Sequence, residues 1–147
     1  MMNNITIDLM NLNDFYSIKD IFKSSFDEFW NVNILKEELE NPSSKFIVAK
    51  YKNEIVGFAG FKILVDCADI MNIAVKKDFR SKGMGSLLLK SLIDLYSSLN
   101  LKFLNLEVNE NNIHAINLYK KFRFKEISVR KNYYPNSENA IIMQLTN

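Results

Sequence analysis

The sequence predicts an α/β fold, of the α+β kind, in which a mixed central sheet of about seven strands carries helices on both faces. Two observations predict it. Short runs rich in β-branched and aromatic residues recur along the chain, and segments with apolar residues at helical spacing separate them. The resulting order, β-α-α-β-β-β-α-β-α-β-β, favours a mixed sheet. At 147 residues, we expect a single domain over 1–147.

The first third of the chain is predicted to contain one strand and two helices. Residues 5–9 alternate in polarity and open the sheet. Asn13 is predicted to cap the next helix, whose apolar stripe consists of Phe15, Ile18, Ile21 and Phe22. A shorter helix is predicted over 33–39, because the residue before Pro42 is pushed out of helical geometry. Three aromatic residues between the helices are expected to pack in the core: Phe26, Phe29 and Trp30.

The middle of the chain is predicted to form three strands and a long helix. The β-rich runs 45–51 and 55–65 are separated by Lys52-Asn53-Glu54, which favours a hairpin. A third run covers 70–75. The pattern over 83–99 is helical, with one apolar face made of Leu88, Leu92, Leu95, Tyr96 and Leu99.

The last third is predicted to contain a strand over 102–108, a helix over 111–122 and two terminal strands, 124–130 and 140–145. A Tyr-Tyr-Pro-Asn turn lies between the terminal strands. The run 70–75, the long helix and the strand 102–108 form a βαβ unit, whose crossover we expect to be right-handed.

Composition excludes several classes of protein. Nineteen basic and seventeen acidic residues give a net charge of +2, which makes no case for nucleic-acid binding. Cys67, the single cysteine, excludes an internal disulfide and is expected to be a buried thiol. His114, the single histidine, is expected on the outer face of its helix, so a catalytic triad or zinc site has little support. With no long apolar run or signal-type segment, we expect a cytoplasmic protein without membrane contact.

A glycine-containing segment precedes the long helix. Glycine lets the backbone approach a ligand closely, and the first N–H groups of a helix have no partner inside it. Gly83 and Gly85, with the charges of Arg80 and Lys82, therefore favour a phosphate group here, although a solvated basic loop is the alternative. No Walker A loop is present. A dinucleotide loop would need a small residue at Leu88, although Glu107 lies about where its ribose-binding acid would be.

Three segments are similar to a known family. Residues 72–88 resemble the acetyl-CoA motif of the GNAT acetyltransferases, whose core is [RQ]-x-x-G-x-[GA]. Residues 106–119 resemble the second motif of that superfamily. Residues 130–143 resemble the RimI-type branch, the ribosomal-protein alanine N-acetyltransferases. The element order predicted above agrees with the GNAT fold.

The resemblance implies a function and a set of site residues. The expected reaction moves acetyl from acetyl-CoA to a protein N-terminal α-amine by direct attack, without a metal; the expected partner is a small-subunit ribosomal protein. It implies that Glu107 is the base and that Tyr119 is the acid that protonates the CoA thiolate. Cofactor-binding residues implied in the same way are Ile73, Ala74 and Val75 for pantetheine, Arg80, Ser81, Lys82, Gly83, Met84, Gly85 and Ser86 for the pyrophosphate, and Asn112.

Several alternatives stay open at this point. Glu107 could be an exposed strand-end acid and Tyr119 a core aromatic, while Tyr133 and Tyr134 either wall the acceptor groove or form a packed pair. The acceptor could be a lysine or a small amine, or the chain could be a non-catalytic acyl-CoA-binding module or a dinucleotide-dependent oxidoreductase. One departure from the family is Arg123, where a glycine usually permits a left-handed helix end.

Overall fold

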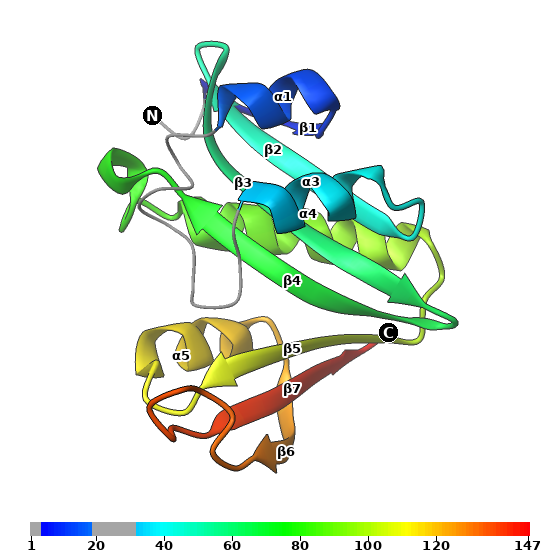
Figure 1. Cartoon of the computed structure of the whole chain (residues 1–147), viewed down its shortest axis with the longest axis vertical. Helices are drawn as coiled ribbons and strands as arrows, with labels where there is room; N and C mark the ends of the chain where they lie inside the picture. Colours follow the sequence, from blue (N-terminus) through cyan, green and yellow to red (C-terminus); the bar gives the residue numbers. More distant parts are fainter. Residues whose placement is uncertain (1–3, 19–31) are drawn as a thin grey trace.

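The computed structural model describes residues 4–18 and 32–147, and its strands form one seven-stranded sheet in the order β1-β2-β3-β4-β5-β7-β6 (Figure 1). The strands are β1 (Ile5–Leu9), β2 (Ser44–Tyr51), β3 (Glu54–Leu64), β4 (Cys67–Val75), β5 (Phe103–Asn109), β6 (Lys125–Arg130) and β7 (Ala140–Thr146). The helices are α1 (Leu12–Ser17), α3 (Val32–Glu40), α4 (Met84–Ser98) and α5 (Ile113–Lys121), with a 3-10 turn, η2 (Lys77–Phe79). The predicted element order is confirmed.

The sheet is mixed because one of its pairs is parallel. Strands β1 to β4 pair antiparallel in sequence order, β4 pairs parallel with β5, and β7 pairs antiparallel with both β5 and β6. The predicted hairpin between β2 and β3 is present. Lys52 and Asn53 at its turn have φ of 51° and 66°, the pair of positive values that suits a two-residue hairpin.

Helices cover both faces of the sheet, as predicted, and each face has its own apolar cluster. Figure 1 shows α1 and α3 on one side of the sheet and α4 on the other. Leu88, Leu89 and Leu92 of α4 are fully buried against one face. Phe58 of β3 and Leu35 of α3 belong to the cluster on the opposite face. Within the described residues, no helix is long and apolar enough to span a membrane.

The cap predicted for α1 is wrong by two residues. Asn11 is the N-cap: its Oδ1 accepts the Asp14 N–H at 2.9 Å, and Asp14 Oδ2 accepts the Asn11 N–H at 3.0 Å. This reciprocal pair satisfies two unpaired donors, so Asn13 lies inside the first turn. The other residues expected in this region, Ile21, Phe22, Phe26, Phe29 and Trp30, lie outside the described residues.

Three further expectations need correction. Strand β4 begins at Cys67 rather than residue 70, because Cys67 already pairs with Leu64 and Phe103. The Cys67 side chain is half-buried rather than buried, and its Sγ donates to the Leu64 carbonyl at 3.3 Å. Burial, then the charges of Asp69 and Asp66, raise the pKa of Cys67, which disfavours a thiolate nucleophile. Leu99, placed on the buried face of α4, is 39% exposed because it is the C-cap.

Arg123 adopts the left-handed geometry that its position requires. Its φ is 72°; its N–H donates to the Lys120 carbonyl at 3.0 Å, and the Phe124 N–H donates to the Tyr119 carbonyl at 3.1 Å. These two bonds form a Schellman motif, and its usual apolar contact is present because the Phe124 and Tyr119 rings lie 5.8 Å apart. The end of α5 is therefore built without glycine.

Candidate active site

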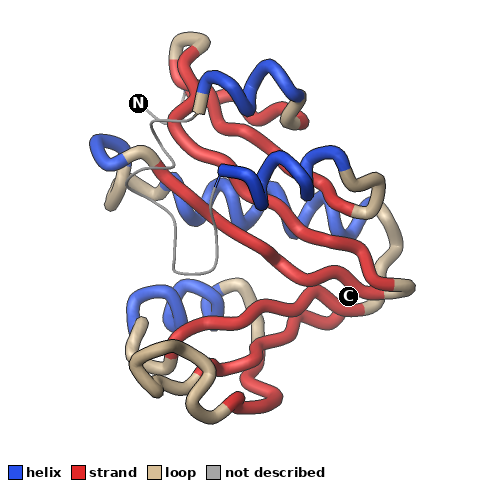
Figure 2. The backbone as a smooth tube through the Cα atoms, viewed as in Figure 1, coloured by secondary structure: helices blue, strands red, loops and turns tan. Residues whose placement is uncertain are grey.

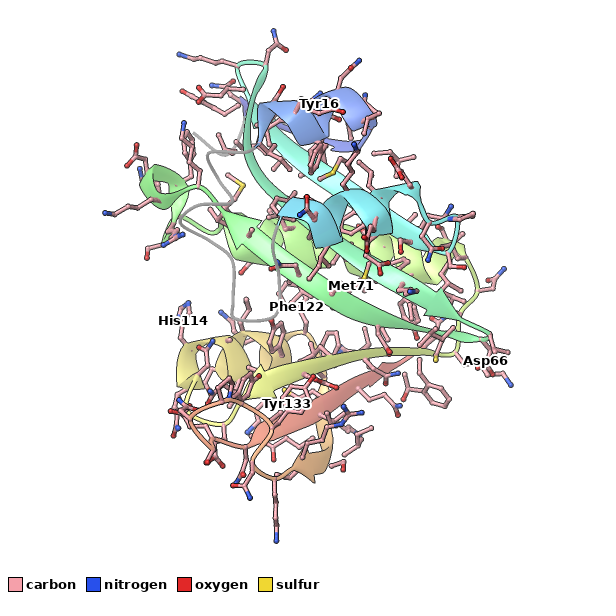
Figure 3. All side chains as sticks on the ribbon, viewed as in Figure 1. Tyr16, Asp66, Met71, His114, Phe122 and Tyr133 are labelled. Carbon is pink, nitrogen blue, oxygen red and sulfur yellow. The ribbon has the colours of Figure 1, made fainter. Side chains whose placement is uncertain are left out.

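The sheet opens between β4 and β5. These parallel strands pair only over three residues, from Cys67 with Phe103 to Asp69 with Asn105, and Figure 2 shows them diverging beyond that point. A cavity of about 390 Å³ lies at the opening. It is lined by Asp69, Ile70, Met71, Asn105, Leu106, Glu107, Ile127, Arg130, Tyr133, Tyr134, Ile142 and Gln144. Figure 3 shows Met71 and Tyr133 on the two sides of this opening.

Alternation along β5 places Glu107 at this cavity. Successive side chains of a strand point to opposite faces. Leu104, Leu106 and Val108 are buried in the cluster that contains α4, so Asn105 and Glu107 share the opposite face, where both line the cavity.

The Glu107 carboxylate has two partners in the cavity wall. Arg130 Nη1 lies 3.1 Å from Glu107 Oε1, and the Arg130 guanidinium lies 5.5 Å from the centre of the Tyr133 ring. Hydrogen bonding with Glu107, followed by burial and the negative charge of Glu107, raises the pKa of Tyr133 against the opposing effect of Arg130. Glu107 keeps 34% of its side chain exposed, so a ligand can reach it.

Tyr119 is not one of the residues that line this cavity, but it is close enough to Tyr134, which does line it, for the two side chains to interact electrostatically. Burial, then the neighbouring Tyr134, raise the pKa of Tyr119 to about 12. Its ring packs against Phe124. The phenol therefore keeps its proton at neutral pH and can act as a hydrogen-bond donor.

The loop between β6 and β7 is tied to the end of β5. The Tyr133 and Tyr134 rings meet edge to face at 5.2 Å, and the Tyr134 N–H donates to the Glu138 carbonyl at 3.2 Å. Across the sheet, the two carboxylate oxygens of Glu110 accept the Asn139 N–H at 3.3 Å and the Asn139 Nδ2 at 3.1 Å. These contacts position both tyrosines at the cavity.

The glycine loop has the geometry of an anion cradle. Gly83 is the N-cap of α4, with φ of 82° and no side-chain cap. No capping side chain therefore accepts a hydrogen bond from the first N–H groups of this helix. A Cβ added at Gly85 would meet no atom within 4 Å. Internal packing therefore does not require glycine there, and the open space beside the positive end of the helix can take a phosphate.

The basic residues of this loop are exposed, and two of them make contacts with nearby groups. Arg80 Nε donates to the Val75 carbonyl at 3.0 Å, which ties the loop to the end of β4. Lys82 Nζ lies 6.0 Å from the centre of the Phe79 ring. Met84, in contrast, is 1% exposed, so only its backbone can contact a ligand.

The far part of β4 offers main chain rather than side chains. Ala74 is 3% exposed, and Ile73 and Val75 pack against the α4 side of the core. Beside them, Asn72 Nδ2 is buried and has no hydrogen-bond partner among the described residues, an unsatisfied donor that a ligand could satisfy. Asn112 is the N-cap of α5, and its Oδ1 accepts the Ala115 N–H at 3.1 Å. This part of β4 therefore presents main chain and one unsatisfied amide donor to a ligand.

The structure brings Glu107, Tyr133 and Tyr134 around one cavity, with Tyr119 adjacent and the glycine loop at the end of β4 that leads away from it. His114 is exposed, as predicted. Four polar residues that line the cavity were not predicted: Asp69, Asn105, Arg130 and Gln144. Alternation with Glu107 could have identified Asn105, whereas the others depend on strand pairings that the sequence does not specify. In the described part of the chain, no group of three metal-ligating side chains is present.

Comparisons with known proteins agree with this geometry. Residues 15–124 match the acetyltransferase (GNAT) family. A Bacillus subtilis (strain 168) protein provisionally named as a ribosomal protein bS18-alanine N-acetyltransferase is 37% identical over 93% of this chain and 92% of its own length. An N-alpha-acetyltransferase of Sulfolobus acidocaldarius is 35% identical over 95% and 91%. The crystal structure of the Escherichia coli ribosomal-protein-S18-alanine N-acetyltransferase superposes with a TM-score of 0.90 at 30% identity, covering 97% of this chain and 93% of that one.

Proposed function

This chain belongs to the acetyltransferase (GNAT) family and is an acetyl-CoA-dependent N-acetyltransferase, and we propose that its acceptor is the α-amine of a protein N-terminus, with the N-terminal alanine of a small-subunit ribosomal protein as the model substrate. The observation that supports this proposal most is the position of Glu107 at the cavity beside the splayed strands. Relatives named for bS18 and N-alpha acetylation support the acceptor class.

Acetyl-CoA would bind along the open edge of β4. The main chain of Ile73, Ala74 and Val75 would contact the pantetheine arm. The loop residues Arg80, Ser81, Lys82, Gly83, Met84, Gly85 and Ser86 would hold the pyrophosphate through their N–H groups and two basic side chains. Asn112, at the start of α5, would help to fix the cofactor. This placement puts the thioester end near the cavity, because β4 runs from the cavity toward the glycine loop.

Glu107 is proposed as the base. The acceptor must lose a proton before it can attack the thioester carbonyl, and a carboxylate in the cavity wall can take that proton directly or through water. An α-amine has an ordinary pKa of about 7.7–8.0, against about 10.4 for lysine. One carboxylate is therefore better matched to an N-terminus than to a lysine side chain.

Tyr119 is proposed as the acid. When the amine nitrogen has bonded to the carbonyl carbon, the carbon–sulfur bond breaks and the electron pair leaves on sulfur. The phenol of Tyr119, with a pKa of about 12, is protonated at neutral pH and can donate its O–H to the thiolate. Tyr133 and Tyr134 would wall the acceptor groove on the opposite side from β4.

Thiol release from acetyl-CoA tests the acceptor class. Two peptides of one sequence are compared: the first has a free N-terminal alanine and no lysine, and the second has a blocked N-terminus and one internal lysine. We expect release only with the first. Release with the second alone would assign a lysine acceptor. Binding of acetyl-CoA without release for either peptide would favour a binding module or a different amine.

A further inference from the structure

We propose that Asp69 makes the enzyme prefer acceptors whose second residue is basic, with arginine or lysine directly after the acetylated residue. This inference rests on the proposed function, because it concerns how a peptide lies in the same cavity.

Asp69 is held in the cavity by a chain of amide side chains. Gln144 Nε2 donates to Asn105 Oδ1 at 2.9 Å, and Asn105 Nδ2 donates to Asp69 Oδ1 at 3.2 Å. The three residues come from neighbouring strands β7, β5 and β4, and all of them line the cavity. Asp69 and Asn105 are also the last paired residues before the strands separate. The carboxylate is therefore fixed at the inner end of the opening.

The charges of the cavity wall do not balance. Of its lining residues, Asp69 and Glu107 are acidic and Arg130 is basic. Arg130 is paired with Glu107, whereas Asp69 has no ion-pair partner among the described residues and accepts a bond from a neutral amide. A carboxylate that is positioned but not neutralised favours a cation on the ligand.

The spacing along β5 fits the second residue of a peptide. Glu107 and Asn105 are two positions apart, about 6.6 Å along the strand, and Asn105 carries the bond to Asp69. Consecutive peptide Cα atoms are about 3.8 Å apart. An α-amine at Glu107 therefore leaves the next residue close enough for a long basic side chain to reach Asp69.

Steady-state acetylation of three peptides tests the preference. The peptides share a free N-terminal alanine and differ only in a second residue of arginine, glutamine or glutamate. We expect kcat/KM for the arginine peptide to exceed that for the glutamine peptide about tenfold, equivalent to about 1.4 kcal/mol, with most of the difference in KM. The glutamate peptide should be the poorest, and the arginine preference should shrink as salt rises.

Asp69→Asn keeps the size of the side chain and an oxygen that can accept the Asn105 bond. We expect kcat/KM for the arginine and glutamine peptides to differ by no more than about twofold in this variant, mainly because kcat/KM for the arginine peptide falls. Asp66→Asn is the matched control, since Asp66 lies at the β3–β4 turn outside the cavity and pairs with Lys102. It should keep the preference.

Two results would overturn the inference: equal use of the three peptides by the wild type, or an equal loss for all peptides in Asp69→Asn. Acetyl-CoA binding with no acetylation of any free N-terminus would instead contradict the proposed acceptor, so the two failures are distinguishable.

Discussion

Arg130 and Glu107 form an ion pair across the width of one strand, with Nη1 3.1 Å from Oε1. Glu107 lies on β5 and Arg130 ends β6, and both strands pair with β7 between them. The same guanidinium lies over the ring of Tyr133. The proposed base is thus held by a cation and a phenol on the acceptor side of the cavity.

Glu107→Gln is expected to lower kcat by about 10²–10⁴-fold, because it removes the proposed base. Acetyl-CoA affinity, measured by calorimetry, should change less than about twofold. Glu126→Gln is the control: Glu126 is an exposed β6 acid paired with Lys120 and is absent from the cavity wall. A variant with nearly wild-type kcat would assign the base to another group.

Arg130→Gln is expected to reduce kcat/KM for the peptide about tenfold, because Glu107 and Tyr133 lose the cation that orients them. Arg130→Lys should have a higher kcat/KM than Arg130→Gln but a lower one than the wild type, since lysine keeps the positive charge but lacks the planar guanidinium group. Steady-state kinetics of the three forms gives the comparison. Equal kinetics in all three would show that the ion pair has no part in positioning Glu107.

Tyr119→Phe removes the proposed acid and is expected to lower kcat by about 10²-fold or more, while acetyl-CoA still binds.

The pKa of about 12 for Tyr119 also predicts a pH effect on stability. An unfolded tyrosine loses its proton near pH 10, whereas folded Tyr119 retains it, so the folded state becomes less stable as pH rises from about 10 toward 12. Melting temperatures at pH 9 and 11 should fall less steeply in Tyr119→Phe than in the wild type.

Gly85→Ala separates ligand binding from folding. A Cβ here meets nothing in the protein, and alanine is the better helix former by about 0.5–1 kcal/mol, so the melting temperature should hold or rise. Acetyl-CoA affinity should fall at least tenfold if the pyrophosphate contacts this turn. Ser97→Ala, on the exposed end of α4, is the control, and unchanged affinity in Gly85→Ala would place the pyrophosphate elsewhere.

Arg123→Gly should raise the free energy of unfolding by about 0.5–1 kcal/mol. Left-handed geometry costs a non-glycine residue about 1–2 kcal/mol, and glycine loses part of this gain through its greater freedom in the unfolded chain. Denaturant titration measures the change. Acetyl-CoA affinity should stay the same, and a large loss would show that the end of α5 is coupled to the cofactor site.

The sequence predicted the order and type of the elements because each has a clear period, such as the leucine face of α4 and the alternation of Ile5–Leu9. It failed at Asn13 because two asparagines compete for one cap, and Asp14 selects Asn11 by bonding back to it. The start of β4 was missed because Cys67 is held there by pairing with a strand 36 residues away.

Residues of the candidate site could be predicted only where they belong to a short local motif. Glu107, Tyr119 and the glycine loop belong to short segments with a recognisable pattern. Asp69, Gln144 and Arg130 reach the same cavity from strands whose neighbours are set by the topology, and no local pattern marks them. The left-handed Arg123 shows a related limit, since a Schellman motif can form around a residue that does not favour it.

The most direct test of the central claim is mass spectrometry of an alanine-initiated peptide incubated with acetyl-CoA and the protein, with the acetyl group located by fragmentation. We expect one acetyl group on the α-nitrogen with the wild type and almost none with Glu107→Gln. Acetylation of a side chain with the α-amine left free, or equal α-amine acetylation by both proteins, would contradict it.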